Sequence, residues 1–154
     1  MHSSKVIVIT GANTGIGLET VKSLLRSNQK YHILLGGRNL VKAQLACQNL
    51  TLETSQSSVE PFQVDVESDD SIEAAYKHIS AKYNSVDCLI NNAGACFDAH
   101  IADGRMTARE AWNKTWDVNV TGVFRFKESE ECFPTGGTSE TTSIRWVPVL
   151  QSRA

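Results

Sequence analysis

Three glycines near the start of the chain have a spacing that suits phosphate binding. Gly11, Gly15 and Gly17 form the pattern G-x-x-x-G-x-G. They follow residues 6–10, a run of apolar and β-branched side chains that is typical of a buried parallel strand. Apolar residues recur at helical spacing from Ile16 onward, so the glycines join a strand to the first turn of a helix. Backbone N–H groups at a helix N-terminus are unpaired and partly positive, and they bind phosphate where no side chain intervenes.

The glycine pattern has a second interpretation. It differs from G-x-G-x-x-G, the usual fingerprint of a dinucleotide-binding turn between a strand and a helix. Glycine also serves in tight turns that hold no ligand, because it adopts backbone conformations that other residues avoid. The pattern alone therefore leaves both a phosphate site and a structural turn open.

Two further motifs make the pattern more specific. Residues 91–94 (NNAG) follow an apolar run, and residues 117–120 (DVNV) lie in a later amphipathic segment. Together with residues 10–17 (TGANTGIG), they resemble, in order and in spacing, the motifs of the short-chain dehydrogenase/reductase family. The resemblance covers about residues 4–124. It implies an oxidoreductase that transfers hydride between a nicotinamide cofactor and a carbonyl or secondary alcohol.

The resemblance implies a cofactor site at the carboxyl ends of the strands, where ligands of doubly wound folds bind. The expected phosphate turn comprises Gly11, Asn13, Thr14, Gly15, Ile16 and Gly17. Asp65 and the backbone of Val66 are expected to hold the adenine, although Asp65 also suits a turn at the end of a strand. Asn92 is expected to contact a ribose, and its NNAG segment also to hold neighbouring strands together.

Arg38 favours NADP over NAD as the cofactor. The second predicted strand ends in Gly36-Gly37-Arg38, and no acidic residue stands there to bind a ribose 2′-hydroxyl. A guanidinium can bind a 2′-phosphate through two hydrogen bonds, whereas a carboxylate would repel it. The alternative is that Arg38 is a solvated surface charge.

The catalytic residues implied by the resemblance are only partly present. Asn119 matches the family's active-site asparagine. The family also uses a serine, and a tyrosine whose pKa is lowered by a lysine four residues later. The three tyrosines are Tyr31, Tyr76 and Tyr83, none is followed by lysine at that spacing, and no tyrosine follows Asn119.

Composition indicates an ordinary globular protein and excludes several classes of function. The 154 residues are 41% hydrophobic and 21% charged, and the net charge of −2 gives no sign of a nucleic-acid partner. No signal peptide or membrane-spanning run is apparent, so the expected location is the cytoplasm. The four cysteines have neither C-x-x-C nor metal-ligand spacing, which predicts free thiols and no metal site.

Strands and helices are predicted to alternate four times along the chain. The expected strands are residues 6–10, 31–35, 62–66 and 86–91, and the expected helices begin near residues 15, 40, 70 and 107. The first helix is expected to end near residue 28, the third is given a capping box at Asp70, and residues 95–106 are expected to form a loop. The last helix carries a stripe of Trp112, Trp116, Val120 and Val123 or Phe124. This pattern predicts an α/β fold, a Rossmann-like doubly wound parallel sheet.

The sheet is expected to be truncated after about four strands. Residues 1–127 then form an incomplete Rossmann domain, and residues 128–154 an irregular or disordered tail without apolar periodicity. We hypothesise that the chain is a truncated product, which sequencing of its transcript tests. The fourth strand would then be an open edge that favours self-association. Two functions stay open: an NADP-dependent oxidoreductase, and a non-catalytic NADP-binding remnant or interaction module.

Overall fold

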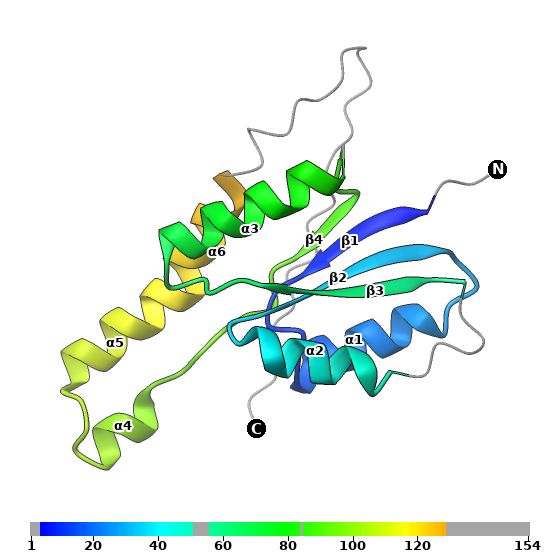
Figure 1. Cartoon of the computed structure of the whole chain (residues 1–154). Helices are drawn as coiled ribbons and strands as arrows, with labels where there is room; N and C mark the ends of the chain where they lie inside the picture. Colours follow the sequence, from blue (N-terminus) through cyan, green and yellow to red (C-terminus); the bar gives the residue numbers. More distant parts are fainter. Residues whose placement is uncertain (1–3, 51–55, 84, 129–154) are drawn as a thin grey trace.

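A computed structural model of the chain describes residues 4–50, 56–83 and 85–128. Strands and helices alternate through these residues, and Figure 1 shows their arrangement. The elements are β1 (Lys5–Ile9), α1 (Gly15–Leu25), β2 (Tyr31–Gly37), α2 (Leu40–Gln48), β3 (Ser58–Gln63), α3 (Asp69–Lys82), β4 (Cys88–Ile90), α4 (Asp98–Ala102), α5 (Ala108–Trp116), the π-helical turn η1 (Asp117–Thr121) and α6 (Gly122–Glu128).

The four strands form one parallel sheet in the order β3-β2-β1-β4. The chain first moves outward from β1 to β2 and β3, and then returns to the other side of β1 to form β4. The carboxyl ends of β1 and β4 therefore flank the point where the strand order reverses, which is where doubly wound folds bind ligands. The predicted α/β Rossmann-like fold is confirmed.

The sheet is buried on both faces, as its Val- and Ile-rich strands require. Ile7 and Ile9 of β1 pack toward α1 and α2, whereas Val8 between them packs on the opposite face. The same alternation occurs in β2, where Leu34 faces away from its two neighbours. Figure 1 shows α1 and α2 below the sheet and α3 with α6 above it. Two separate apolar cores therefore hold the carboxyl edge of the sheet in place.

The predicted position of the third strand is wrong. Residues 62–66 were expected, but β3 starts at Ser58 and ends at Gln63, so Asp65 and Val66 lie beyond the strand. Pairing with β2 fixes this register, with Ser58 opposite His32 and Gln63 opposite Gly37. Within the described residues β3 pairs with β2 only, and such an edge position tolerates a proline, which has no N–H to donate.

The predicted start of the third helix is also wrong. Ser68, not Asp70, is the N-cap of α3, and its hydroxyl accepts a hydrogen bond from the backbone N–H of Ser71. Asp69 and Asp70 instead occupy the first turn, where carboxylates interact favourably with the positive end of the helix. The helix therefore begins two residues earlier than the pattern at Asp70 predicts.

Other boundaries differ by a few residues. The helix α1 ends at Leu25 rather than at residue 28, β2 continues to Gly37, and β4 covers only Cys88–Ile90 of the expected residues 86–91. The expected loop at residues 95–106 contains the short helix α4. Of the predicted tail, only Glu128 lies within the described residues, where it ends α6. No described helix is both long and apolar enough to cross a membrane.

The aromatic stripe of the last predicted helix faces solvent. Trp112 is 70% exposed and Trp116 is 66% exposed, and no described residue covers them. The opposite side of this segment packs on the rest of the fold and carries the buried residues Ala111, Val118 and Phe126. The segment formed by α5, η1 and α6 is therefore apolar on two sides, and the described residues cover one of them.

A cluster of titratable side chains lies at the amino end of the sheet. The Glu60 carboxylate accepts a hydrogen bond from the Tyr83 hydroxyl at 3.0 Å and pairs with the Lys82 ammonium at 2.5 Å. His32 also contacts the Tyr83 hydroxyl, and His78 lies 3.3 Å from Glu60. Burial, together with the hydrogen bond to Glu60, raises the pKa of Tyr83 to about 12. Tyr83 is therefore held neutral in the folded protein.

We expect Tyr83→Phe to change how stability depends on alkaline pH. Because the folded pKa of about 12 exceeds the ordinary value of about 10, the stabilisation by neutral Tyr83 is complete below pH 10. It is lost as the pH rises through about 12. Urea unfolding from pH 8 to pH 11.5 should show a steeper loss of unfolding free energy for the wild type than for the variant. Parallel curves would show that Tyr83 does not ionise differently on unfolding.

Candidate functional site

The glycine turn after β1 has the backbone that its sequence predicts. Gly11 and Gly15 have φ angles of +62° and +57°, a region that side chains disfavour. A Cβ atom on Gly11 would lie 2.8 Å from the Cα of Ala93, whereas a Cβ on Gly15 would meet no atom within 4 Å. Gly11 is thus required for packing between two strand ends, and Gly15 borders open space above the turn.

The N-terminus of α1 is available to an anion. Its N-cap is Thr14, whose side chain makes no capping hydrogen bond. The first turn, which includes Ile16, contains no acidic residue. Helices normally satisfy these N–H groups with a side chain, water or a ligand. The eleven-residue helix therefore presents uncapped donors and its positive end toward the space beside Gly15.

Thr10 and Asn92 join the ends of β1 and β4. The hydroxyl of Thr10 accepts hydrogen bonds from the backbone N–H groups of Asn92 and Ala93, at 3.1 and 3.0 Å. The amide of Asn92 donates to the carbonyls of Thr10 and Gly11, at 3.1 and 3.0 Å. A Cβ on Gly17 would lie 2.5 Å from this amide. Asn92 therefore fixes the glycine turn, and it is already fully engaged as a donor.

Arg38 extends from the carboxyl end of β2, near the glycine turn. Its side chain is 73% exposed and lies 3.4 Å from the carboxylate of Glu67. The neighbouring Gly37 approaches Asn13 so closely that a Cβ would be 3.1 Å from its amide oxygen. Asn13 and Arg38 consequently border one region beside the glycine turn.

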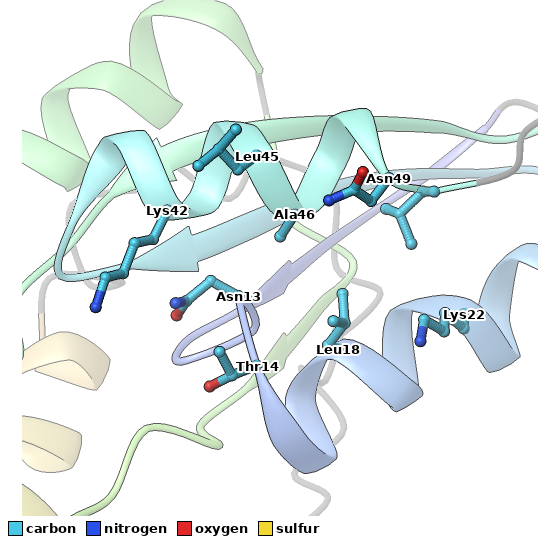
Figure 2. Close-up of a pocket in the computed structure, with 9 residues that line it drawn as sticks. Asn13, Thr14, Leu18, Lys22, Lys42, Leu45, Ala46 and Asn49 are labelled. Carbon is cyan, nitrogen blue, oxygen red and sulfur yellow. The ribbon is translucent and has the colours of Figure 1, made fainter.

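A cavity of about 430 Å³ opens beside this region, between α1 and α2. Figure 2 shows Asn13 and Thr14 at one end of it and the side chain of Lys42 reaching toward the same end. Leu18 and Ala46 form part of its apolar floor. Lys42 lies in the first turn of α2, four residues after Arg38, and is a further residue at this site that the motifs do not predict.

Asp65 and Val66 lie in the loop that follows β3. One carboxylate oxygen of Asp65 accepts a hydrogen bond from the backbone N–H of Glu67 at 3.1 Å, as the turn interpretation predicts. Ser71 accepts a hydrogen bond from the backbone N–H of Asp65 at 2.9 Å. A side chain on Gly122 would overlap the carbonyl of Val66, so η1 and α6 meet this loop backbone to backbone.

Asn119 holds the loop after β4 against the last helical segment. Its amide donates to the carbonyl of Ala95 at 2.7 Å and accepts from the N–H of the same residue at 3.0 Å. Asn119 lies in the π-helical turn η1, a helical irregularity that is frequent at functional sites. Both polar atoms of its side chain are thereby engaged by Ala95.

The structure thus brings most of the expected site residues to the carboxyl edge of the sheet. The glycine turn, Arg38 and Asn92 follow the neighbouring strands β1, β2 and β4, and the loop of Asp65 and Val66 follows β3. Two charged residues near them were missed, Glu67 and Lys114. They form an ion pair at 2.5 Å between the loop after β3 and α5, and no sequence pattern links residues so far apart.

Comparison with known sequences finds one family along most of the chain. A family model described as short chain dehydrogenase matches residues 5–131. The short-chain dehydrogenase/reductase eupG of a Phoma species is 43% identical over 127 residues, which cover 80% of this chain and 46% of that relative. The chain therefore spans about half the length of the curated relatives it matches.

Solved structures show the same fold. The L-sorbose reductase of Gluconobacter frateurii, complexed with NADPH and L-sorbose, has a TM-score of 0.68 at 28% identity, covering 82% of this chain and 46% of its own. An alcohol dehydrogenase of the archaeon Thermococcus sibiricus, complexed with 5-hydroxy-NADP, has a TM-score of 0.66 at 26% identity, covering 82% and 52%.

We expect Asn119→Ala to lower the free energy of unfolding by about 2 kcal/mol, because it leaves the N–H and carbonyl of Ala95 without their partners. Asn113→Ala is the matched control, since Asn113 is exposed on α5, and its effect should stay within about 0.5 kcal/mol. Chemical denaturation measures both. Equal effects would show that the Ala95 contact does not anchor the helix.

Proposed function

The chain belongs to the short-chain dehydrogenase/reductase family, and from this premise we propose that it binds NADP through the carboxyl edge of its sheet. The cofactor's pyrophosphate lies on the glycine turn and the N-terminus of α1. The adenine lies against Asp65 and Val66. Asn92 holds the turn and borders the nicotinamide ribose.

The uncapped N-terminus of α1 carries this proposal. Its N–H donors face open space beside Gly15, and the first turn has no acidic side chain that could bind them. The glycines of the turn carry no side chain, so a phosphate can approach these donors closely. The pyrophosphate would supply the anion that these N–H groups lack. Asn13, Thr14 and Ile16 complete the turn around it.

Arg38 supports the choice of NADP rather than NAD. No acidic residue stands at the end of β2, and Arg38 is exposed enough to turn toward a 2′-phosphate. The similar L-sorbose reductase was solved with NADPH, and the similar alcohol dehydrogenase with 5-hydroxy-NADP. Both relationships agree with the preference proposed for this chain.

The proposed reaction of the whole family member is oxidoreduction of a small carbonyl or secondary alcohol. The nicotinamide supplies hydride transfer when it is bound. Asn119 keeps the loop after β4 in position beside the proposed nicotinamide end. The sequence has no tyrosine followed by lysine at the required spacing, so general acid–base catalysis by this chain alone is not expected.

The missing tyrosine and lysine favour a second candidate function. The chain would then be a non-catalytic NADP-binding remnant or an interaction module that binds through its uncovered surfaces. Residues 1–127 form the binding domain in either case. A cytoplasmic location is part of the same proposal.

We expect the purified protein to bind NADPH more tightly than NADH, and Arg38→Ala to weaken NADPH binding by about tenfold while leaving NADH unchanged. Gly15→Ala should weaken both cofactors because it places a side chain beside the pyrophosphate. Gly104→Ala is its matched control, since Gly104 also has a positive φ of 75° and open space around it, but lies far from the turn. Fluorescence titration measures all four proteins. Equal weakening by the two glycine variants would contradict the proposed turn.

We also propose that the chain self-associates through the uncovered edge of β4 and the exposed side of α5. Within the described residues β4 pairs only with β1, and Trp112 and Trp116 lie largely in solvent. Gel filtration over a range of concentrations should show species larger than 16.9 kDa that dissociate on dilution. Replacing both tryptophans with serine should shift the protein toward the monomer. A monomer at every concentration would refute the proposal.

A further inference from the structure

The carboxylate of Glu67 lies between two cations at the adenosine end of the proposed cofactor site. One oxygen contacts the ammonium of Lys114 at 2.5 Å, and the other lies 3.4 Å from the guanidinium of Arg38. The backbone of Glu67 is fixed as well, because its N–H donates to Asp65. Glu67 therefore connects the end of β2, the loop after β3 and the helix α5.

The two cations differ in how freely they can move. The side chain of Glu67 is 18% exposed and that of Lys114 is 41% exposed, whereas Arg38 is 73% exposed. The shorter ion pair is also the more buried one. Arg38 can therefore rotate away from Glu67 while Lys114 stays and keeps the carboxylate neutralised.

We propose that Glu67 is a specificity-determining residue, whose carboxylate competes with the 2′-phosphate of NADP for Arg38. Lys114 acts as a positioning residue, because it neutralises Glu67 and so releases Arg38 to the phosphate. This inference rests on the proposed function, in which Arg38 binds that phosphate.

The charges at this end of the site give the direction of each effect. A 2′-phosphate brings about two negative charges close to Glu67. The Glu67 carboxylate therefore repels the phosphate, and it also pairs with Arg38, the residue that would bind the phosphate. NAD carries no 2′-phosphate, so neither the repulsion nor the competition for Arg38 changes its affinity. Removing the charge of Glu67 therefore favours NADPH, and removing the charge of Lys114 disfavours it.

The experiment measures dissociation constants of NADPH and NADH by fluorescence titration of the full chain. Glu67→Gln should tighten NADPH by about threefold to tenfold and leave NADH unchanged. Lys114→Gln should weaken NADPH by a similar factor. In a protein that already carries Glu67→Gln, Lys114→Gln should not change the dissociation constant of NADPH further. Such non-additivity shows that Lys114 acts through Glu67, whereas a loss of packing would weaken binding in both backgrounds.

The matched controls come from the cluster at the opposite end of the sheet. Glu60 and Lys82 also form an ion pair at 2.5 Å, and their exposures of 22% and 53% are close to those of Glu67 and Lys114. Glu60→Gln and Lys82→Gln remove the same charges at a distance from the cofactor. Neither variant should alter the ratio of the two dissociation constants.

Each result has one interpretation. An unchanged ratio in Glu67→Gln, with Arg38→Ala still weakening NADPH, would overturn this inference and leave the proposed function intact. A wild-type protein that binds neither cofactor, or binds both equally, would overturn the proposed function and this inference with it. A change of equal size in the Glu60→Gln control would show a general effect of charge and also overturn the inference.

Discussion

The hydroxyl of Thr10 is the contact on which the carboxyl edge of the sheet depends. It is buried at 1% exposure and accepts the backbone N–H groups of two consecutive residues after β4. The chain that leaves β4 is thereby tied to the end of β1, at the place where the strand order reverses. The return bonds from Asn92 fix the carbonyls of the glycine turn. This junction holds the glycine turn, and with it the start of α1, against the end of β4.

The elements that were predicted correctly are those whose local pattern agrees with their final environment. β1 and β2 are buried on both faces, and their continuous Val, Ile and Leu runs indicate this directly. β3 is an edge strand of mostly half-buried residues that includes Pro61, so its pattern is weak. Its register is decided by pairing with β2, and such a long-range interaction cannot be read from six residues.

The same distinction applies to the proposed site. The glycine turn and the NNAG segment are local motifs, so the sequence predicts both their presence and their place at strand ends. The packing of Gly122 against Val66 and the ion pair between Glu67 and Lys114 join distant parts of the chain. Each of these residues is ordinary in its own segment. Their roles arise only when α5, η1 and α6 come to lie beside the loop after β3.

The exposed position of the tryptophans determines what intrinsic fluorescence can report. In the part of the chain that the structure describes, tryptophan occurs only at residues 112 and 116, two positions on either side of Lys114 on one short helix. Both indole rings are solvated in the native fold, so emission from these two is already red-shifted. It senses events at the surface of α5 and is nearly blind to melting of the sheet. Circular dichroism therefore follows the core, and the emission of Trp112 and Trp116 follows whatever touches this helix.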